Sequence, residues 1–445
     1  MRGKTILLSL AGLVVAGGLV GLGVVGWMVL QPGPYGFAEG TKVALADYKG
    51  PSPTGLPVEL AKADAATRGE YIARMADCEA CHTAKGGAPF AGGRAFVLPF
   101  GTIYTPNITP DAETGIGKWT DAQFLNAVHR GIAPDGSRYY PAFPYPSYTL
   151  LTDEDTLAIK AYLFSLAPVT QANQPNTFGF PYNQRWLMAI WATLFNPDKR
   201  FQPVDGQSPE WNRGAYLVEA AGHCGECHTP RNLMQALDQR HKFGGGVAEG
   251  WNAYNISADR VSGIGDWSAE ELAAYLSAGH AKGRGSASGP MGEAVDLSLS
   301  HLTASDIDAI VTYVRTVPPV AGNLPRLAGP APATPRLSGL DNPIGQRVFQ
   351  GNCASCHGWT GAGAVREEAG LTGVRAVNDP SGANVALMVL HGSGGVWPGH
   401  PLMPAFGKAY SDAEVAAVAN YVTARFGAVP STLTPDDIAK LRAME

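Results

Sequence analysis

The chain has 445 residues, of which 45% are hydrophobic and 16% are charged, and its formal net charge is −5. That length exceeds what one ordinary hydrophobic core serves, so about three domains are expected. No basic stripe is present to neutralise phosphates, which argues against nucleic acid as a partner. The low share of charged residues predicts that partners or a membrane cover part of the surface.

The first segment in chain order is strongly apolar. Arg2 and Lys4 precede an uncharged run over residues 5–30. A helix needs about 20 apolar residues to span a bilayer, whereas a signal-peptide core has roughly 7–15. We therefore predict a transmembrane anchor within residues 1–34, a single span in the cytoplasmic membrane with the rest of the chain on the periplasmic side. The alternative is a long signal peptide that is cut near Ala46.

Three copies of the sequence Cys-x-x-Cys-His follow along the chain, and together they use all six cysteines. The pattern is typical of covalent attachment of haem c, because two thiols one helical turn apart can each add to a vinyl group and the next His can bind the iron. The predicted thioether residues are Cys78, Cys81, Cys224, Cys227, Cys353 and Cys356. The predicted proximal iron ligands are His82, His228 and His357. The sequence thus predicts three covalent haems and electron transfer.

Cys-x-x-Cys has two other common interpretations. Zinc sites usually pair one such knuckle with a second Cys or His pair nearby, whereas these motifs are separated by domain-sized gaps. A disulfide oxidoreductase needs only one motif and has no need of a His directly after each copy. Haem attachment therefore remains the favoured interpretation.

Each motif stands in a similar setting. A predicted helix with a glycine near its start leads into each motif, and the glycines are Gly69, Gly214 and Gly345. A polar cap and an amphipathic helix end each repeat, and the caps are Thr152, Thr303 and Ser411. A hydroxyl residue followed by an acidic residue three positions later is a capping signal. The plan of helix, haem motif, long loop and helix is that of a small, mostly helical cytochrome c domain, whose core the haem completes.

The predicted fold class is mainly α, with three tandem cytochrome c-like domains and an N-terminal transmembrane helix. The expected segments after the anchor are domains over 60–168, 210–320 and 342–428, a connecting segment over 169–209, a linker over 321–341 and a tail over 429–445. The connecting segment contains an apolar helix that is too short to span a bilayer. It either packs between the first two domains or dips into the membrane beside a quinone pocket.

The sixth iron ligand is expected from the loop ahead of each closing helix, most often as Met. Met291 and Met403 occupy this place in the second and third repeats. The first repeat has Phe143 there, which cannot bind iron. His129 is the other strong ligand in that repeat, so we predict bis-His ligation of the first haem, with an open or water-bound iron as the alternative. Bis-His ligation predicts a lower potential for that haem.

Other short motifs give less information about function. Asn107-Ile108-Thr109 and Asn255-Ile256-Ser257 fit the glycosylation pattern, but we interpret both as loop structure beneath the haem. No dinucleotide fingerprint, phosphate loop or Gly-x-Ser-x-Gly sequence is found. The cofactor that oxidises a substrate is therefore expected on another chain, and we predict no substrate-oxidising site here.

The chain resembles the triheme cytochrome c subunit of membrane-bound periplasmic dehydrogenases. The sequences that carry this resemblance lie in 100–111, 131–136, 140–145, 222–231 and 403–406. The resemblance implies that the subunit takes electrons from a catalytic dehydrogenase subunit, with or without an iron–sulfur subunit, and passes them to membrane ubiquinone. The alcohol and sugar branch usually has Met where this chain has Phe143. The Phe form is similar to the branch that serves molybdopterin and iron–sulfur enzymes, including aldehyde dehydrogenases and nicotinate-type hydroxylases, and we favour an aldehyde-oxidising complex.

Two functions of other classes remain open. One is a free-standing, membrane-anchored carrier that serves another respiratory complex. The other is a haem enzyme such as a peroxidase, which would use an open iron at the first haem. Copurification of large partner chains would favour the subunit, and peroxide or cyanide binding at the first haem would favour the enzyme.

Overall fold

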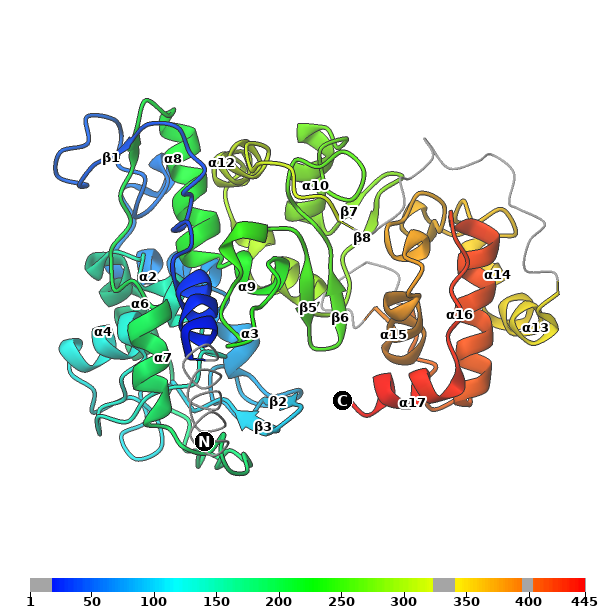
Figure 1. The fold of residues 1–445 in the computed structure, drawn as a ribbon, viewed down its shortest axis with the longest axis horizontal. Coiled ribbons are helices and arrows are strands. Elements are labelled where there is room, and N and C mark those ends of the chain that lie inside the picture. Colours follow the sequence, from blue (N-terminus) through cyan, green and yellow to red (C-terminus); the bar gives the residue numbers. More distant parts are fainter. Residues whose placement is uncertain (1–17, 323–340, 394–402, 445) are drawn as a thin grey trace, which may run out of the picture.

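The computed structural model describes residues 18–322, 341–393 and 403–444. These residues are mostly helical, with four small antiparallel hairpins or strand pairs. We refer to the parts around the three Cys-x-x-Cys-His motifs as the first, second and third units, with the predicted boundaries 60–168, 210–320 and 342–428. Figure 1 shows the first and second units side by side and the third unit set apart from them at the C-terminal end. The prediction of a mainly helical fold is confirmed.

The elements of the first unit begin with the short helix η1. They are η1 (Val58–Leu60), α2 (Ala65–Met75), α3 (Cys78–His82), β2 (Ala95–Leu98), β3 (Gly101–Tyr104), α4 (Asp121–Arg130), α5 (Tyr145–Tyr148) and α6 (Asp153–Ser165). Strand β2 pairs with β3 in an antiparallel hairpin. Outside the unit, β1 (Thr41–Lys42) pairs with β4 (Val204–Asp205), and α7 (Leu187–Phe195) lies in the connecting segment.

The second unit repeats this order, and the described part of the third repeats its helices without a strand pair. The second contains α8 (Pro209–Tyr216), η2 (Leu217–Ala221), α9 (Gly225–His228), η3 (Gln239–His241), β5 (Gly246–Ala248), β6 (Trp251–Ala253), α10 (Ala269–Ala278), β7 (His280–Ala281), β8 (Gly285–Ser286), α11 (Pro290–Leu297), η4 (Leu299–His301) and α12 (Ala304–Val314). The third contains α13 (Pro343–Asn352), α14 (Ala354–His357), η5 (Glu367–Ala369), η6 (Ala376–Asn378), α15 (Ala383–His391) and α16 (Asp412–Phe426), and α17 (Pro435–Arg442) follows it.

In every unit the opening helix packs closely against the closing helix: α2 against α6, α8 against α12 and α13 against α16. The repeated glycine makes this approach possible. A Cβ atom at Gly69 would lie 1.9 Å from the carbonyl oxygen of Ala158, and one at Gly214 would lie 1.9 Å from that of Ala309. In the third unit, Gly345 stands at the same place beside Ala417. Any larger residue would push the two helices apart, because side-chain atoms cannot overlap backbone atoms.

The predicted caps begin the closing helices. The hydroxyl oxygens of Thr152 and Thr303 accept hydrogen bonds from the backbone N–H three residues later, and Ser411 forms a full capping box with Glu414. Each cap satisfies a backbone donor that the helix itself leaves without a partner. The sequence signal and the start of each helix therefore coincide.

One continuous hydrophobic core joins the first two units. It contains Ile72 and Leu163 from the first unit together with Tyr216 and Tyr313 from the second. The third unit has a separate core around Phe349 and its neighbours on α15 and α16. The predicted domain boundaries stay a prediction, but the first two units fold around shared apolar side chains and the third does not.

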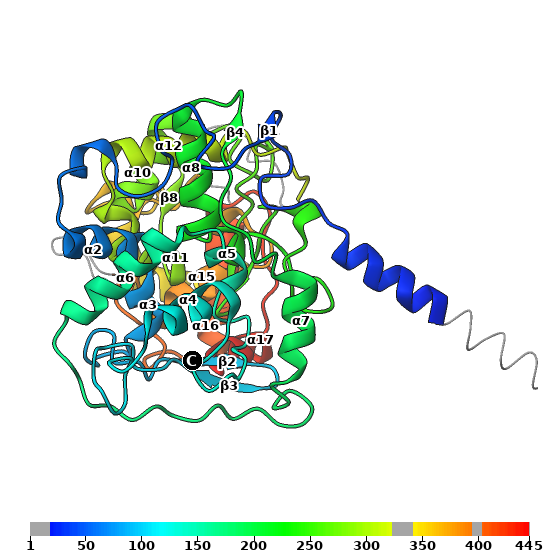
Figure 2. The same cartoon turned by 90° about the vertical axis from the view of Figure 1, so that its left-hand side faces the viewer.

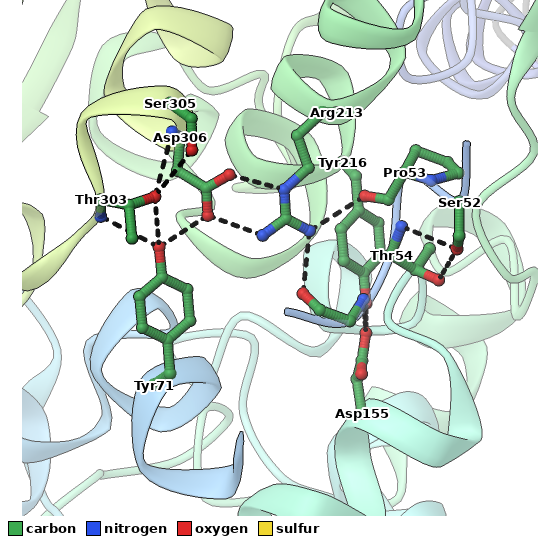
Figure 3. A network of polar contacts seen from close by, with 11 residues as sticks. Ser52, Pro53, Thr54, Tyr71, Asp155, Arg213, Tyr216, Thr303, Ser305 and Asp306 are labelled. Carbon is green, nitrogen blue, oxygen red and sulfur yellow. Dashed lines mark hydrogen bonds and ion pairs between the residues drawn. The ribbon is translucent and has the colours of Figure 1, made fainter. Parts of the chain in front are cut away.

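Two buried carboxylates tie the first unit to the second in a reciprocal way. Tyr71 of the first unit donates a hydrogen bond to Asp306 of the second at 2.7 Å, and Arg213 binds the same carboxylate through two nitrogens at 2.8 and 2.6 Å (Figure 3). Conversely, Tyr216 of the second unit donates to Asp155 of the first at 2.6 Å. Both carboxylates are at most 1% exposed. A buried charge is tolerated when it is paired, and Arg68 pairs with Asp155 at 2.7 Å as Arg213 does with Asp306.

Helix α7 lies between the first two units and outside both. Its Trp191 packs edge-on against Tyr145 of the first unit, with ring centroids 6.1 Å apart, and donates a hydrogen bond to the carbonyl of Met234 in the second at 2.7 Å. This supports packing between the units for the apolar helix. Its opposite side carries the exposed side chains of Trp186 and Ile190, and Figure 2 shows α7 along one edge of the body.

The predicted N-terminal transmembrane helix is not supported. Within the three described stretches of the chain, no helix combines the length and the apolar character that crossing a bilayer requires. The helical part of the predicted span that is described covers residues 18–29. Residues 1–17 lie outside the described residues. The predictions of this helix and of a single span in the cytoplasmic membrane are therefore corrected.

The reciprocal pairing predicts a large cost for losing Arg213. In Arg213→Leu, Asp306 stays buried without its cation, and we expect the free energy of unfolding to fall by about 3–5 kcal/mol. Denaturant-induced unfolding of the full chain measures this. The control is Lys118→Leu, which removes an exposed ion pair with Glu113 and should cost less than about 1 kcal/mol. Equal unfolding midpoints for the two variants would contradict the prediction.

Candidate haem sites

Each Cys-x-x-Cys-His sequence forms one short helical turn. The three turns are α3, α9 and α14, each of which ends at the histidine of its motif. Residues three apart on a helix lie on the same side, so the two cysteines of each motif face one way, with the histidine beside them. All six thiols are free, five of them are half-buried and Cys356 is exposed. This arrangement allows two thioether bonds to one planar group from each turn.

The three histidines share one hydrogen bond to the backbone. Nδ1 of His82 lies 2.8 Å from the carbonyl oxygen of Pro106, Nδ1 of His228 lies 2.6 Å from that of Tyr254, and Nδ1 of His357 lies 2.7 Å from that of Ala369. A carbonyl oxygen can only accept, so Nδ1 must carry the proton and donate it. Nε2 of each neutral ring then holds a lone pair that is available to a metal ion.

Burial keeps these rings in the form that binds iron. It lowers the pKa of His82, His228 and His357, while the hydrogen bond to the backbone carbonyl opposes that shift. A lowered pKa means that the imidazole is neutral at neutral pH. A neutral imidazole is the form that coordinates a metal.

The backbone after each histidine is also held alike. The carbonyl oxygen of each histidine accepts a hydrogen bond from a glycine N–H, and these glycines are Gly92, Gly245 and Gly363. Asn107 and Asn255 each accept a bond from the backbone N–H two residues later, at 2.9 and 2.8 Å. Both asparagines are at most 5% exposed. The interpretation of these sequences as loop structure is confirmed, since they fix the chain that supplies the carbonyl to the histidine.

The alternatives to haem attachment find no support here. Burial raises the pKa of Cys78 and of Cys224 to about 12, and it raises that of Cys353 to about 11. Catalytic or redox-active thiols have lowered values, because the thiolate is the reactive form. In the described part of the chain, no three His, Cys, Asp or Glu side chains gather in a way that could hold a metal ion. A zinc cluster and a dithiol centre are both disfavoured.

The predicted distal ligands lie on segments that follow the motif turns. Met291 is half-buried in the first turn of α11. Met403 is half-buried against the core of the third unit, and its carbonyl accepts a hydrogen bond from Ser393 at 3.0 Å. A thioether on a fixed segment beside an apolar core suits iron ligation. The assignment of both methionines stays a prediction.

The first unit differs at this place. Phe143 lies among aromatic rings, 5.8 Å from Tyr139 and 5.7 Å from Tyr148 between centroids. His129 is fully buried, and its Nε2 lies 2.8 Å from the hydroxyl of Thr156 on α6. That contact engages a ring nitrogen that iron ligation would need, so the geometry favours a structural role for His129. Its assignment as a sixth ligand stays a prediction.

The residues present fit three covalent haems. Each site pairs two thiols with a histidine whose Nδ1 is already bonded, and two of the three have a methionine on a later segment. This donor set, repeated in the order Cys-x-x-Cys-His, is that of haem c. Within each unit, the cysteines would hold the porphyrin by its edge and the histidine would bind the iron.

The first and second sites lie close together. Ser147 of α5 donates a hydrogen bond at 2.9 Å to Glu226, which lies inside the second motif. Helix α11 of the second unit packs in turn against α3, the first motif. Arg94 reinforces this contact, because it binds the carbonyl of Ala80 and the carboxylate of Glu293, both at 2.7 Å. Helix α5, which follows Phe143, therefore lies beside the second motif, and helix α11, which contains Met291, lies beside the first.

Sequence reasoning missed the three carbonyl acceptors at Pro106, Tyr254 and Ala369. A backbone carbonyl has no side-chain signature, so residue identity gives no hint of this role. For the first two a signal did exist. Each stands directly before one of the Asn-Ile-Ser/Thr sequences, at matching places in the repeat.

Comparison with known proteins agrees with this geometry. The cytochrome c family model matches residues 66–167 and 344–425. The gluconate 2-dehydrogenase cytochrome c subunit of Pantoea cypripedii is 40% identical over 85% of this chain and 89% of its own length. The alcohol dehydrogenase (quinone) cytochrome c subunit of Komagataeibacter europaeus is 37% identical over 84% of this chain and 83% of its own. A nicotinate dehydrogenase subunit of Pseudomonas putida is 41% identical over 81% of this chain, which spans only 30% of that protein.

The structural role of His129 predicts no change in haem spectra when it is replaced. His129→Gln keeps a group that can hydrogen-bond Thr156, so we expect the visible and EPR spectra to stay as in the parent protein. A thermal unfolding curve checks that the variant is folded. Conversion of one haem from low spin to high spin would contradict this role and would support ligation by His129.

The buried ring also predicts how stability depends on pH. Burial, reinforced by nearby Arg200 and opposed by Asp153, lowers the pKa of His129 from 6.5 to about 4. Between these two values the unfolded chain binds a proton that the folded chain does not, so stability should fall as the pH drops from 6.5 to about 4. Unfolding midpoints measured across this range should fall less steeply in His129→Gln. Parallel curves for the two proteins would contradict the prediction.

Proposed function

This chain belongs to the family of cytochrome c subunits found in gluconate and alcohol dehydrogenases, and we propose that it carries three haem c groups that pass electrons from a catalytic dehydrogenase subunit to ubiquinone. Cytochrome c subunits of dehydrogenase complexes transfer electrons, and a catalytic dehydrogenase chain is their partner. The number of haems, the substrate of the complex and the electron acceptor are proposed in addition to this.

The observation that carries the proposal is the hydrogen bond between Nδ1 of each motif histidine and a backbone carbonyl. It recurs in all three units although the residue that supplies the carbonyl differs, being Pro106, Tyr254 and Ala369. Such a bond fixes the tautomer and orientation of a metal-binding histidine and raises its basicity. Three histidines whose Nε2 is free for a metal support the proposal of three haem irons.

Roles can be proposed for the residues of each site. The cysteine pairs at 78 and 81, 224 and 227, and 353 and 356 hold the groups in place. His82, His228 and His357 bind iron on one side, and Met291 and Met403 bind it on the other side in the second and third units. A haem supplies reversible one-electron chemistry when bound. The protein tunes that chemistry through the axial ligand, hydrogen bonds and burial.

We propose an aldehyde-oxidising enzyme as the catalytic partner, with or without an iron–sulfur subunit. The support is Phe143, which stands where the alcohol and sugar branch usually has Met. The similarity to the nicotinate dehydrogenase of Pseudomonas putida adds support, because nicotinate-type hydroxylases belong to the branch that has Phe. Ubiquinone as acceptor is supported by the relative named alcohol dehydrogenase (quinone), cytochrome c subunit.

The haem count predicts a mass. The periplasmic-targeted, purified chain should exceed its apo mass by three haem groups, and replacing both cysteines of any one motif by serine should remove one group and leave two. Intact-protein mass spectrometry, with a pyridine haemochrome assay, measures this. A parent protein with fewer than three groups, or a double-serine variant that keeps all three, would refute the proposal.

The partner and acceptor predict what copurifies and what is reduced. Gentle purification of the native complex should retain a large catalytic chain, and added aldehyde should reduce the haems and then a soluble ubiquinone analogue. Ethanol and gluconate serve as matched control substrates. Isolation of the chain alone, with haems that accept electrons from no dehydrogenase, would favour a free-standing carrier.

A further inference from the structure

The third unit docks on the second through the edge of the β5–β6 hairpin. The backbone N–H of Asn252 donates to the side-chain oxygen of Asn384 at 2.8 Å, and the side-chain nitrogen of Asn384 donates to the carbonyl of Asn252 at 3.0 Å. Asn384 stands in the first turn of α15 and is 7% exposed. Its amide therefore completes the open edge of β6 as another strand would.

The first unit covers the equivalent edge in another way. There the backbone N–H of Tyr104 donates at 3.0 Å to the side-chain oxygen of Asn176, which lies in the connecting segment. Both hairpins thus have an asparagine side chain on the same edge position. Only in the second unit does that asparagine come from a different unit, so this edge is one of the places where the third unit is held. Arg375 of the third unit also binds the carbonyls of Val261 and Gly263 in the second, at 3.2 and 3.3 Å.

A buried carboxylate of the third unit strengthens the contact. Oδ2 of Asp379 accepts hydrogen bonds from the side chain of Asn252 at 2.9 Å and from the hydroxyl of Tyr254 at 3.2 Å. Its Oδ1 accepts the N–H of Ser381 at 2.9 Å, and Asp379 is 3% exposed. Burial, with the nearby Asp379 carboxylate, raises the pKa of Tyr254 well above its ordinary value. The phenol is therefore a permanent donor.

Tyr254 is in contact with both sides of this interface. Its hydroxyl binds Asp379 of the third unit, and its carbonyl accepts the 2.6 Å hydrogen bond from Nδ1 of His228. The corresponding acceptors in the other units are Pro106 and Ala369, whose side chains have no hydrogen-bonding group. Of the three motif histidines, His228 alone is thereby linked through its acceptor residue to a neighbouring unit.

We propose that Tyr254 is a positioning residue for His228, and that docking of the third unit through Asp379 and Asn384 sets the redox potential of the second haem. This inference rests on the proposed function, because it requires a haem at His228. A hydrogen bond to Nδ1 makes the imidazole a stronger donor to the metal. A stronger donor favours the oxidised iron, so a well-docked third unit lowers the potential of the second haem.

The alternative is that these contacts only hold the two units together. Potentials separate the two roles, because an interface without influence on His228 leaves every haem potential as it was. The first and third haems act as controls within the same molecule, since their histidines bind carbonyls of Pro106 and Ala369.

The test uses the full-length, haem-loaded chain, in which mass spectrometry has already shown three haems. Tyr254→Phe removes one oxygen atom and keeps the ring. Asn384→Ala breaks the docking at β6 without touching Tyr254, and it serves as the main variant if Tyr254→Phe fails to accumulate. Tyr48→Phe is the matched control, since it removes a hydroxyl that accepts a hydrogen bond from Asn212, away from this interface. Potentiometric titration followed by EPR resolves the haems.

The expected result is that one of three midpoint potentials rises in Tyr254→Phe, that the same one rises in Asn384→Ala, and that Tyr48→Phe matches the parent. The double variant should rise by less than the sum of the two single shifts, because both changes act through the same contact. Unchanged potentials in Tyr254→Phe, or equal shifts of all three haems, would overturn the proposal. A parent protein lacking a haem would instead show that the proposed function is wrong.

Discussion

The exchange of hydrogen bonds at Asp155 and Asp306 is the constraint on which the arrangement of the first two units depends. Each carboxylate is buried and takes a tyrosine hydroxyl from the other unit, Tyr216 in one case and Tyr71 in the other. Separating the units would remove a tyrosine hydrogen bond from each carboxylate, while each would keep the arginine of its own unit, Arg68 for Asp155 and Arg213 for Asp306. The shared hydrophobic core adds a large non-directional attraction, while the carboxylates fix the register in which the two units meet.

That register decides where the candidate haem sites lie. The two tyrosine–aspartate hydrogen bonds join α2 to α12 and α8 to α6. In this arrangement α5 packs against η2 just ahead of the second motif, and α11 packs against α3, the first motif. Ser147 bonded to Glu226 and Arg94 bonded to Glu293 complete the two contacts. The same interface that stabilises the pair therefore brings both motif turns together.

Much of each unit could be predicted from its sequence because the signals are local. A hydroxyl residue at a helix cap and an acidic residue three positions on, or a glycine where two helices cross, act within a few residues or through one close contact. The tyrosine–aspartate exchange could not be predicted, since Tyr71 and Asp306 are 235 positions apart and neither stands out in its own segment. The acceptors for the motif histidines could not be predicted from side chains, because they are backbone carbonyls. The prediction from hydropathy was wrong, because no described helix is long and apolar enough to provide the membrane span that the apolar N-terminal run predicted.

The third unit shows what happens when the exchange is absent. Its positions equivalent to Arg213 and Tyr216 hold Ile344 and Arg347, and Ile344 is 41% exposed. Without the arginine and the tyrosine, this face cannot repeat the pairing that joins the first two units. The third unit instead contacts the second through polar groups, among them the amide of Asn384 and the carboxylate of Asp379 at the edge of the β5–β6 hairpin. Such polar contacts between domains are weaker and more readily reversed than a shared apolar core. Among the described residues, this polar joint between the second and third units is also the one that reaches Tyr254, whose carbonyl accepts the hydrogen bond from His228.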